Sequence, residues 1–115
     1  DDFPDYISLP AAAVSRAPHD TRALIFGGSG NGEAMLANRY PGVRAAVYHG
    51  GNLDIVRLAR EHNDANILSI GARFVSETEL VDAVTLWLET RPLGEEKYDR
   101  RNKKIELLTK QLHTV

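Results

Sequence analysis

The sequence predicts an α/β protein in which a parallel β-sheet is covered by α-helices. Three short apolar runs alternate with longer stretches of helical composition along the 115 residues. Strands that alternate with helices in this way normally pair in parallel. A glycine-rich turn, GGSGNGEA at residues 27–34, follows the first apolar run. Open α/β sheets usually bind their ligands at such a turn.

The first segment predicts a helix whose start is set by prolines. Pro4 suits a helix start, whereas Pro10 would break a helix interior. We therefore expect the helix to begin near Ser8, with Pro10 in its first turn. Residues 23–26 (ALIF) are a short apolar run before glycines and predict a buried strand. Residues 32–40 (GEAMLANRY) have a helical composition, and a Pro-Gly pair ends that helix.

Two strands and the helix between them follow. Residues 43–49 (VRAAVYH) predict a strand that two glycines close. Residues 52–62 (NLDIVRLAREH) carry apolar side chains at helical spacing, with Asn52 as a candidate N-cap. Residues 66–71 (NILSIG) predict the third short strand.

The last third of the sequence predicts two helices. Ser76 and Glu79 have the spacing of a capping box ahead of a helix over residues 80–88, which ends before Pro92. The final helix is expected from about residue 95 to 112. Its apolar stripe consists of Ile105, Leu108 and Leu112. Three strands make a narrow sheet for this architecture, which suggests that an N-terminal unit is missing.

Composition narrows the class of protein. The length suits one domain over residues 1–115, and 43% apolar with 26% charged residues is ordinary for a globular protein. A formal net charge of −2 argues against nucleic-acid binding. The absence of cysteine excludes disulfides and thiolate chemistry, and cytoplasm is the expected compartment. No apolar run is long enough to span a membrane.

The glycine loop resembles two phosphate-binding motifs and departs from both at the same residue. The dinucleotide fingerprint fits Gly28 and Gly30, but its third glycine would fall at Glu33. The P-loop motif requires a lysine at that same position. A triphosphate beside Glu33 would lose this lysine and be repelled by the carboxylate.

Glu33 and Ser29 each have a structural and a functional interpretation. A carboxylate in a first helical turn is stabilised by the helix dipole by roughly 0.3–1 kcal/mol. Alternatively, Glu33 is a general base beside amide groups that hold a developing oxyanion. Ser29 is either a plain loop serine or a group that exchanges a proton with a substrate oxygen. The residues alone leave these alternatives open.

Other polar groups also have two interpretations. His62 ends a predicted helix, where a histidine commonly interacts with the helix dipole. Lys97 and Arg101 share one face of the last helix, which is either solvated or binds a monophosphate. Arg73 follows the third strand on the ligand side of the sheet and could join that phosphate site. The histidines lack ligand-like spacing, so no metal site is expected.

Four stretches together resemble the ribose-5-phosphate isomerase type B family, which includes the galactose-6-phosphate isomerase subunits. They are DFPDY, GGSGNGEAMLANRYPGVRAA, RLAREHNDANILSIGARF and EEKYDRRNKKI. The resemblance implies a Rossmann-like three-layer α/β sandwich with a long C-terminal helix. It also implies a homodimer or tetramer, without metal or cofactor, that interconverts aldose and ketose phosphates through an enediolate.

The resemblance assigns a base to the glycine loop. One branch of the family uses a cysteine base at the position that matches Gly27. This sequence is similar to the other branch, in which a glutamate at the position of Glu33 takes the C2 proton. Ser29 matches the hydroxyl that moves a proton between the substrate oxygens. The expected anion hole is formed by loop amides and includes Gly28, Gly30, Asn31 and Gly32.

The resemblance places the remaining site residues in two groups. His62 matches the histidine that opens the furanose ring, and Asn63 matches its substrate-binding neighbour. The phosphate-binding positions are Arg73, Lys97 and Arg101, with lysine at Lys97 where arginine is usual. The family's site lies between two subunits, so His62 is expected to serve the partner's loop.

The resulting hypothesis is an isomerase of ribose 5-phosphate and ribulose 5-phosphate in the pentose phosphate pathway. One alternative is a hexose-6-phosphate isomerase acting on allose or galactose 6-phosphate. Another is a non-catalytic sugar-phosphate-binding subunit. The family begins with a strand–helix–strand unit that carries an Asp-His pair, and the present sequence is expected to start after that unit.

Overall fold

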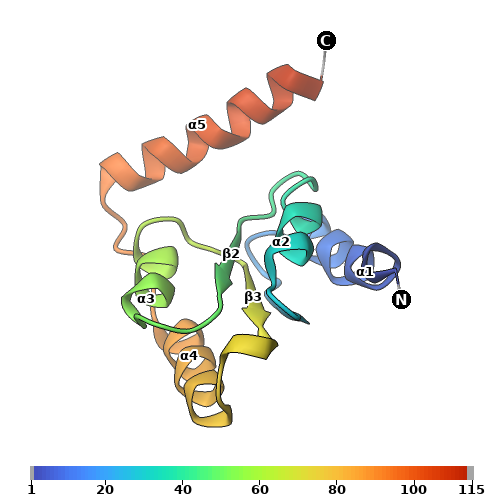
Figure 1. Ribbon diagram of the computed structural model, residues 1–115. Helices are drawn as coiled ribbons and strands as arrows, with labels where there is room; N and C mark the ends of the chain where they lie inside the picture. Colours follow the sequence, from blue (N-terminus) through green and yellow to red (C-terminus); the bar gives the residue numbers. More distant parts are fainter. Residues whose placement is uncertain (1, 114–115) are drawn as a thin grey trace.

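The computed structural model describes residues 2–113, in which helices and strands alternate (Figure 1). The elements are α1 (Phe3–Arg16), β1 (Ala23–Gly27), α2 (Asn31–Ala37), β2 (Ala45–Tyr48), α3 (Asp54–Glu61), β3 (Ile67–Gly71), the short 3-10 helix η1 (Ala72–Phe74), α4 (Glu77–Glu89) and α5 (Glu96–His113). Within this part of the chain, no helix is long and apolar enough to cross a membrane.

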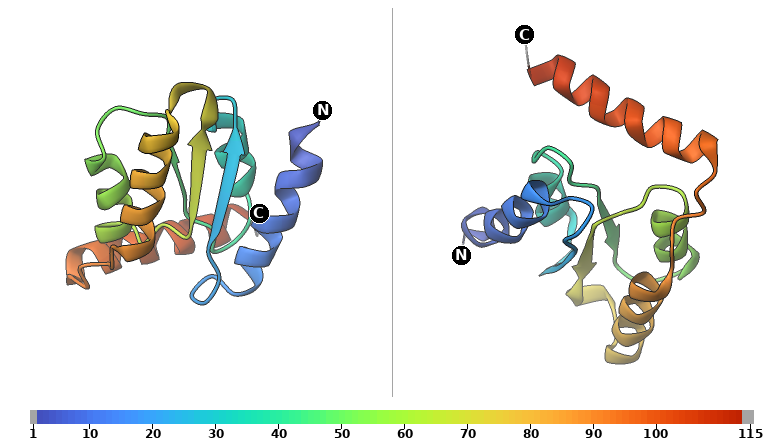
Figure 2. Two further views of the ribbon diagram at one scale, coloured as in Figure 1. Left: turned by 90° about the horizontal axis from the view of Figure 1, so that it is seen from below. Right: turned by 180° about the vertical axis from the view of Figure 1, so that it is seen from behind.

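The three strands form one parallel sheet in the order β1-β3-β2. Ala23 and Ala45 both lie beside Ile67, and Gly27 at the end of β1 lies beside Gly71 at the end of β3. The carboxyl ends of the strands therefore share one edge of the sheet (Figure 2). Within the part of the chain that the structure describes, the outer edge of β1 pairs with no other strand.

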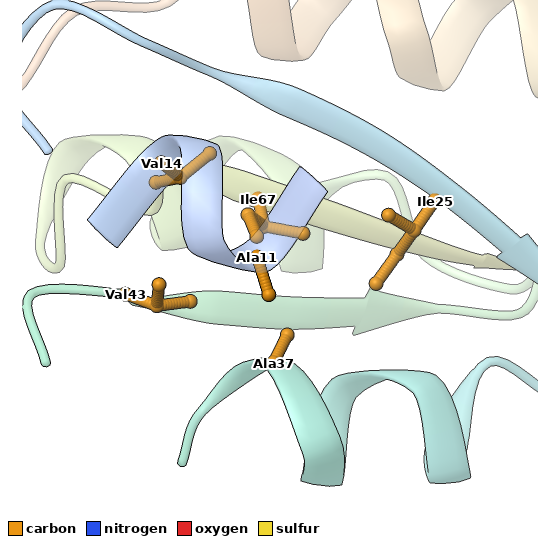
Figure 3. Packing of buried hydrophobic residues seen from close by; sticks show 6 residues of the cluster. All are labelled: Ala11, Val14, Ile25, Ala37, Val43 and Ile67. Carbon is orange, nitrogen blue, oxygen red and sulfur yellow. The ribbon is translucent and has the colours of Figure 1, made fainter. Parts of the chain in front are cut away.

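The helices cover both faces of the sheet and give the predicted three layers. On one face, α1 and α2 bury a cluster that consists of Ala11, Val14, Ile25, Ala37, Val43 and Ile67 (Figure 3). On the other face, α3 and α4 bury Tyr48, Val56, Leu68, Ile70, Ala83 and Trp87. The alternation along β3 explains this division, because successive side chains of a strand point to opposite faces. The α/β class and the three parallel strands are confirmed.

The predicted start of the first helix near Ser8 is wrong. Helix α1 begins at Phe3, and Pro10 lies in its interior. Proline removes one helical hydrogen bond, which leaves the carbonyl of Tyr6 without its usual donor. Tyr6 lies at the surface, where water can bond that carbonyl, while Ala11 and Val14 are fully buried. Burial of the apolar face of α1 outweighs the local cost of the proline.

Other predicted ends shift by a few residues for visible reasons. Helix α2 ends at Ala37, and the side-chain amide of the C-cap residue Asn38 bonds both backbone groups of Ala45, at 2.8 and 3.1 Å. Asn52 lies one position before the N-cap residue of α3, yet its Oδ1 accepts the Asp54 N–H at 2.9 Å. The capping box of α4 is confirmed.

Helix α5 lies apart from the three layers, along the edge at the amino ends of the strands (Figure 2, left). The predicted apolar stripe is present, but its side chains are exposed in this single chain. They are Ile105, Leu108 and Leu112. Contacts of Tyr98, Asn102 and Glu106 join the helix to the rest of the chain.

Candidate active site

The glycine loop is fastened to the neighbouring strand β3. Gly30 is the N-cap residue of α2 and has a left-handed backbone, with φ of 81°. Its carbonyl accepts the buried Ser69 hydroxyl at 2.7 Å. A Cβ at Gly30 would lie 3.1 Å from the Ser69 Oγ and from the backbone of Ile70 and Gly71. Glycine is thus required here both by the backbone angle and by the close approach of β3.

The Glu33 side chain turns back toward the end of β1. Glu33 lies in the first turn of α2 and is 9% exposed. Its carboxyl group lies against the Cα of Gly27, so closely that a Cβ on Gly27 would overlap it. A favourable interaction with the helix dipole does not require burial, since exposed acids in a first turn already gain roughly 0.3–1 kcal/mol. The acid is instead held at the carboxyl edge of the sheet.

The other loop residues differ in what they offer a ligand. Ser29 Oγ accepts the Asn31 N–H at 3.2 Å, so this amide is already used within the loop. A Cβ on Gly32 would lie 2.9 Å from the Phe3 ring, so Gly32 packs against α1. Gly28 is exposed and lies beside the Arg73 guanidinium, whose Nη2 would be 3.1 Å from a Cβ there.

Arg73 lies at the same edge of the sheet as Glu33 and Ser29, at the carboxyl ends of the strands. Its backbone N–H donates to the Gly28 carbonyl at 3.1 Å, which fixes the start of η1 beside the loop.

Tyr48 ends β2 at this edge. Burial raises the pKa of its phenol, and the carboxylates of Glu79 and Asp82 raise it further. Tyr48 therefore stays protonated at neutral pH and is not a competing base.

The predicted residues His62 and Asn63 lie at the opposite edge of the sheet. Because α3 connects two parallel strands, it runs against them, and its end lies at their amino ends. The His62 ring stacks on Tyr98 of α5, with ring centroids 4.0 Å apart and planes 13° apart. Lys97 Nζ is 5.0 Å and Arg101 Cζ is 5.8 Å from the centroid of the Tyr98 ring. These residues form one cluster around Tyr98.

Asn102 completes the link between α5 and the end of α3. Its side-chain amide donates to the His62 carbonyl at 2.9 Å and accepts from Asn63 Nδ2 at 3.2 Å. Sequence reasoning missed Tyr98 and Asn102. The available signal was their spacing, because residues four apart share a helix face next to the predicted basic positions.

A cleft of about 170 Å³ opens beside His62, between the end of α3 and α5. Its acidic lining residues are Glu61, Asp64, Asp99 and Glu106, against the basic residues Arg44 and Lys103. Lys97 and Arg101 do not line it. Glu61 and Asp64 are paired with arginines, and the predicted phosphate-binding residues lie outside this cleft.

Two arginines hold the turn that follows His62. Asp64 has a left-handed backbone, with φ of 47°, which is uncommon outside glycine. Arg44 Nε donates to the Asp64 carbonyl at 2.9 Å and to the Asn63 carbonyl at 3.1 Å. Arg60 is 1% exposed and donates at 2.7 Å to the Asp64 carboxylate and the Ala65 carbonyl. These bonds stabilise the turn that presents His62 and Asn63.

We expect Arg60→Met to lower the free energy of unfolding by about 2–3 kcal/mol, because it leaves the buried Ala65 carbonyl without its donor and removes the ion pair with Asp64. Methionine retains the apolar stem, so the loss reports the hydrogen bonds. Urea unfolding monitored by circular dichroism measures the change. Arg57→Met on the same helix is the matched control, since the partly exposed ion pairs of Arg57 are expected to be worth about 1 kcal/mol or less. Equal losses for both variants would contradict this account of Arg60.

Within residues 2–113, no three histidine, aspartate or glutamate side chains lie so that they could hold a metal ion together. The structure instead divides the predicted site into two halves. Glu33, Ser29, Arg73 and the loop glycines lie at the carboxyl edge, and the cluster around Tyr98 lies at the amino edge. The chain is thus an α/β protein with a glycine-rich loop at the carboxyl ends of its parallel strands, where proteins of this class usually bind their ligands.

The chain belongs to the ribose/galactose isomerase family, whose model matches residues 1–105. Ribose-5-phosphate isomerase B of Mycolicibacterium paratuberculosis is 34% identical over 114 residues, which are 99% of this chain and 68% of that protein. The Mycobacterium tuberculosis H37Rv enzyme of the same name is 34% identical over 101 residues, 88% of this chain and 60% of its own. The chain thus spans roughly two thirds of the length of these relatives.

Solved structures agree with this family. Ribose-5-phosphate isomerase B from Mycoplasma genitalium with bound ribulose-5-phosphate superposes with a TM-score of 0.89 at 33% identity, covering 96% of this chain and 70% of that one. The Clostridium thermocellum enzyme gives a TM-score of 0.88 at 38% identity, covering 97% and 73%. The predicted family and fold are confirmed.

Proposed function

We propose that the protein is a cofactor-independent aldose–ketose isomerase that interconverts ribose 5-phosphate and ribulose 5-phosphate. The observation that carries the proposal is the Glu33 carboxyl group, which is buried at the carboxyl edge and directed at the strand end. The sugar phosphate in the Mycoplasma genitalium relative supports the substrate class. Such an enzyme belongs to the pentose phosphate pathway, and we expect it in the cytoplasm.

The proposed chemistry moves one proton between two carbons. Glu33 takes the proton from C2 of the open-chain aldose, and the electron pair of that C–H bond forms the C1–C2 double bond of an enediolate. The C1 carbonyl oxygen becomes the oxyanion, which loop N–H groups stabilise. Ser29 transfers a proton between the two substrate oxygens, and Glu33 returns its proton to C1. Atoms and charge balance without a further reactant.

The phosphate and the ring-opening step are assigned to the second half of the site. His62 opens the furanose ring, and Asn63 binds the sugar beside it. Lys97 and Arg101 bind the phosphate together with Arg73. Stacking on Tyr98 fixes the plane of the His62 ring, and Asn102 fixes the backbone below it. Lysine at position 97 keeps the charge of the family's arginine but not its bidentate geometry.

The two halves require two copies of the chain. Glu33 and His62 lie at opposite edges of one sheet, so one chain cannot bring both to the same sugar. In a homodimer, or a tetramer built from such dimers, the loop of one subunit meets the Tyr98 cluster of its partner. The exposed stripe of Ile105, Leu108 and Leu112 gives α5 an apolar surface for this contact.

The test of the substrate is a competition on the intact protein. Ribose 5-phosphate is assayed against allose 6-phosphate and galactose 6-phosphate, and kcat/KM is compared. We expect the pentose phosphate to be preferred by at least about tenfold, since one misfit carbon unit in a site costs roughly that factor. If a hexose phosphate were preferred, the proposed substrate would be wrong, whereas the proposed isomerase chemistry would stand. Tight binding without turnover of any sugar would contradict the proposal and indicate a binding subunit.

A further inference from the structure

The glycine at position 27 is not explained by the conformation of the backbone. Gly27 ends β1, lies beside Gly71 in the parallel register, and is not among the residues with a positive φ angle. Any residue can adopt such a strand conformation, and glycine weakens a strand because it restricts the unfolded chain least. A side chain at this position would be favoured by the strand itself.

The explanation lies in what occupies the space beside Gly27. The three atoms nearest to a Cβ built there are the carboxyl carbon and both carboxyl oxygens of Glu33. At Gly28 the nearest atoms instead belong to Arg73, and at Gly30 they belong to β3. Of these loop glycines, Gly27 is the one whose side-chain space is filled by the proposed base.

We infer that Gly27 is a positioning residue: its missing side chain leaves the space in which the Glu33 carboxylate is held. The catalytic part of this inference rests on the proposed role of Glu33 as base. Any Cβ at position 27 would force the carboxylate to rotate away from the strand end. A misplacement of about 1 Å at a reacting group can cost 100-fold in rate. The end of a glutamate side chain is flexible, so the protein tolerates this rotation and remains folded.

The kinetic test is a double-mutant cycle with Gly27→Ala and Glu33→Gln. Gly27→Ala is expected to lower kcat by about 100-fold with KM within about threefold, because the base moves and the phosphate contacts stay. Added to Glu33→Gln, it is expected to lower kcat no further, since the base is already absent. If kcat of the double variant instead fell by the product of the two single-variant factors, position 27 would act independently of Glu33. That result would overturn the inference.

A second double-mutant cycle, measured by thermal unfolding, tests without reference to activity whether residue 27 and the Glu33 carboxylate compete for the same space. Gly27→Ala is expected to lower Tm by a few degrees more when Glu33 is present than in the Glu33→Ala background, because the new side chain at position 27 then meets no carboxylate. Glu33→Gln should behave like the natural residue, because its amide fills the same volume. Gly28→Ala is the matched control and should shift Tm equally in both backgrounds, since its neighbour is Arg73.

The two cycles separate failure of the inference from failure of the proposed function. If Gly27→Ala shifts Tm equally with Glu33 and with Ala at position 33, the inference is overturned. If the melting cycle shows the coupling but Glu33→Gln keeps full turnover, Gly27 still holds the carboxyl group and the assignment of Glu33 as base is wrong.

Discussion

Glu33→Gln is expected to lower kcat for the interconversion of ribose 5-phosphate and ribulose 5-phosphate by about 100-fold or more, as is typical for loss of a general base. The amide has nearly the same shape as the carboxylate and fills the space beside Gly27, but it cannot accept the C2 proton. KM should change little, because the residues proposed to bind the phosphate are other ones. A coupled assay of ribulose 5-phosphate formation with the intact protein measures the loss.

A matched control distinguishes catalysis from helix stabilisation. Glu77 also lies in the first turn of a helix, α4, but is exposed and far along the chain from the loop. Glu77→Gln removes the same favourable interaction with a helix dipole, worth roughly 0.3–1 kcal/mol, and should leave kcat unchanged. Near-normal turnover of Glu33→Gln would show that Glu33 is a structural residue and would remove the basis of the proposed mechanism.

Co-expression of two inactive variants is expected to restore activity if the site is shared between subunits. One variant is Glu33→Gln, and the other carries Lys97→Ala and Arg101→Ala. In a mixed dimer one site receives both defects and the other receives none. With random pairing, about a quarter of the sites should then be intact, whereas every site is defective in either variant alone.

The pairing of Glu33→Gln with Ser29→Ala is the control for this experiment. Both residues lie on the same loop, so each site of the mixed dimer carries one of the two defects. No restoration is expected from this pair. If the first pair also gives no activity while mixed dimers are present, the two halves of the site do not meet between subunits.

Much of the fold could be predicted because each element carries a local signal. The capping box of Ser76 and Glu79 fixes the start of α4, and glycines mark the ends of β1 and β3. The start of α1 was predicted wrongly because Pro10 is a strong local signal that burial of Ala11 and Val14 overrides. Packing across the chain decides such positions, and it is not visible in a local pattern.

The candidate site was predictable in composition but not in arrangement. Glu33 was noticeable because it departs from two phosphate motifs at one position. The contact of its carboxyl group with Gly27 depends on the direction of a side chain, which spacing does not determine. Tyr98 and Asn102 were missed because their partners, His62 and Asn63, are about 40 residues away along the chain. The roles assigned to these residues remain predictions.

The outer edge of β1, which pairs with no strand in residues 2–113, bears on how the polypeptide behaves at high concentration. Protein sheets usually protect such edges with charges, prolines or bulges, because free backbone groups recruit strands from other molecules. Residues 23–27 (ALIFG) carry none of these protections, and Phe26 is half exposed. A partner that covered this edge would also protect it from such pairing. A concentrated preparation of the chain is therefore expected to favour strand-mediated aggregation.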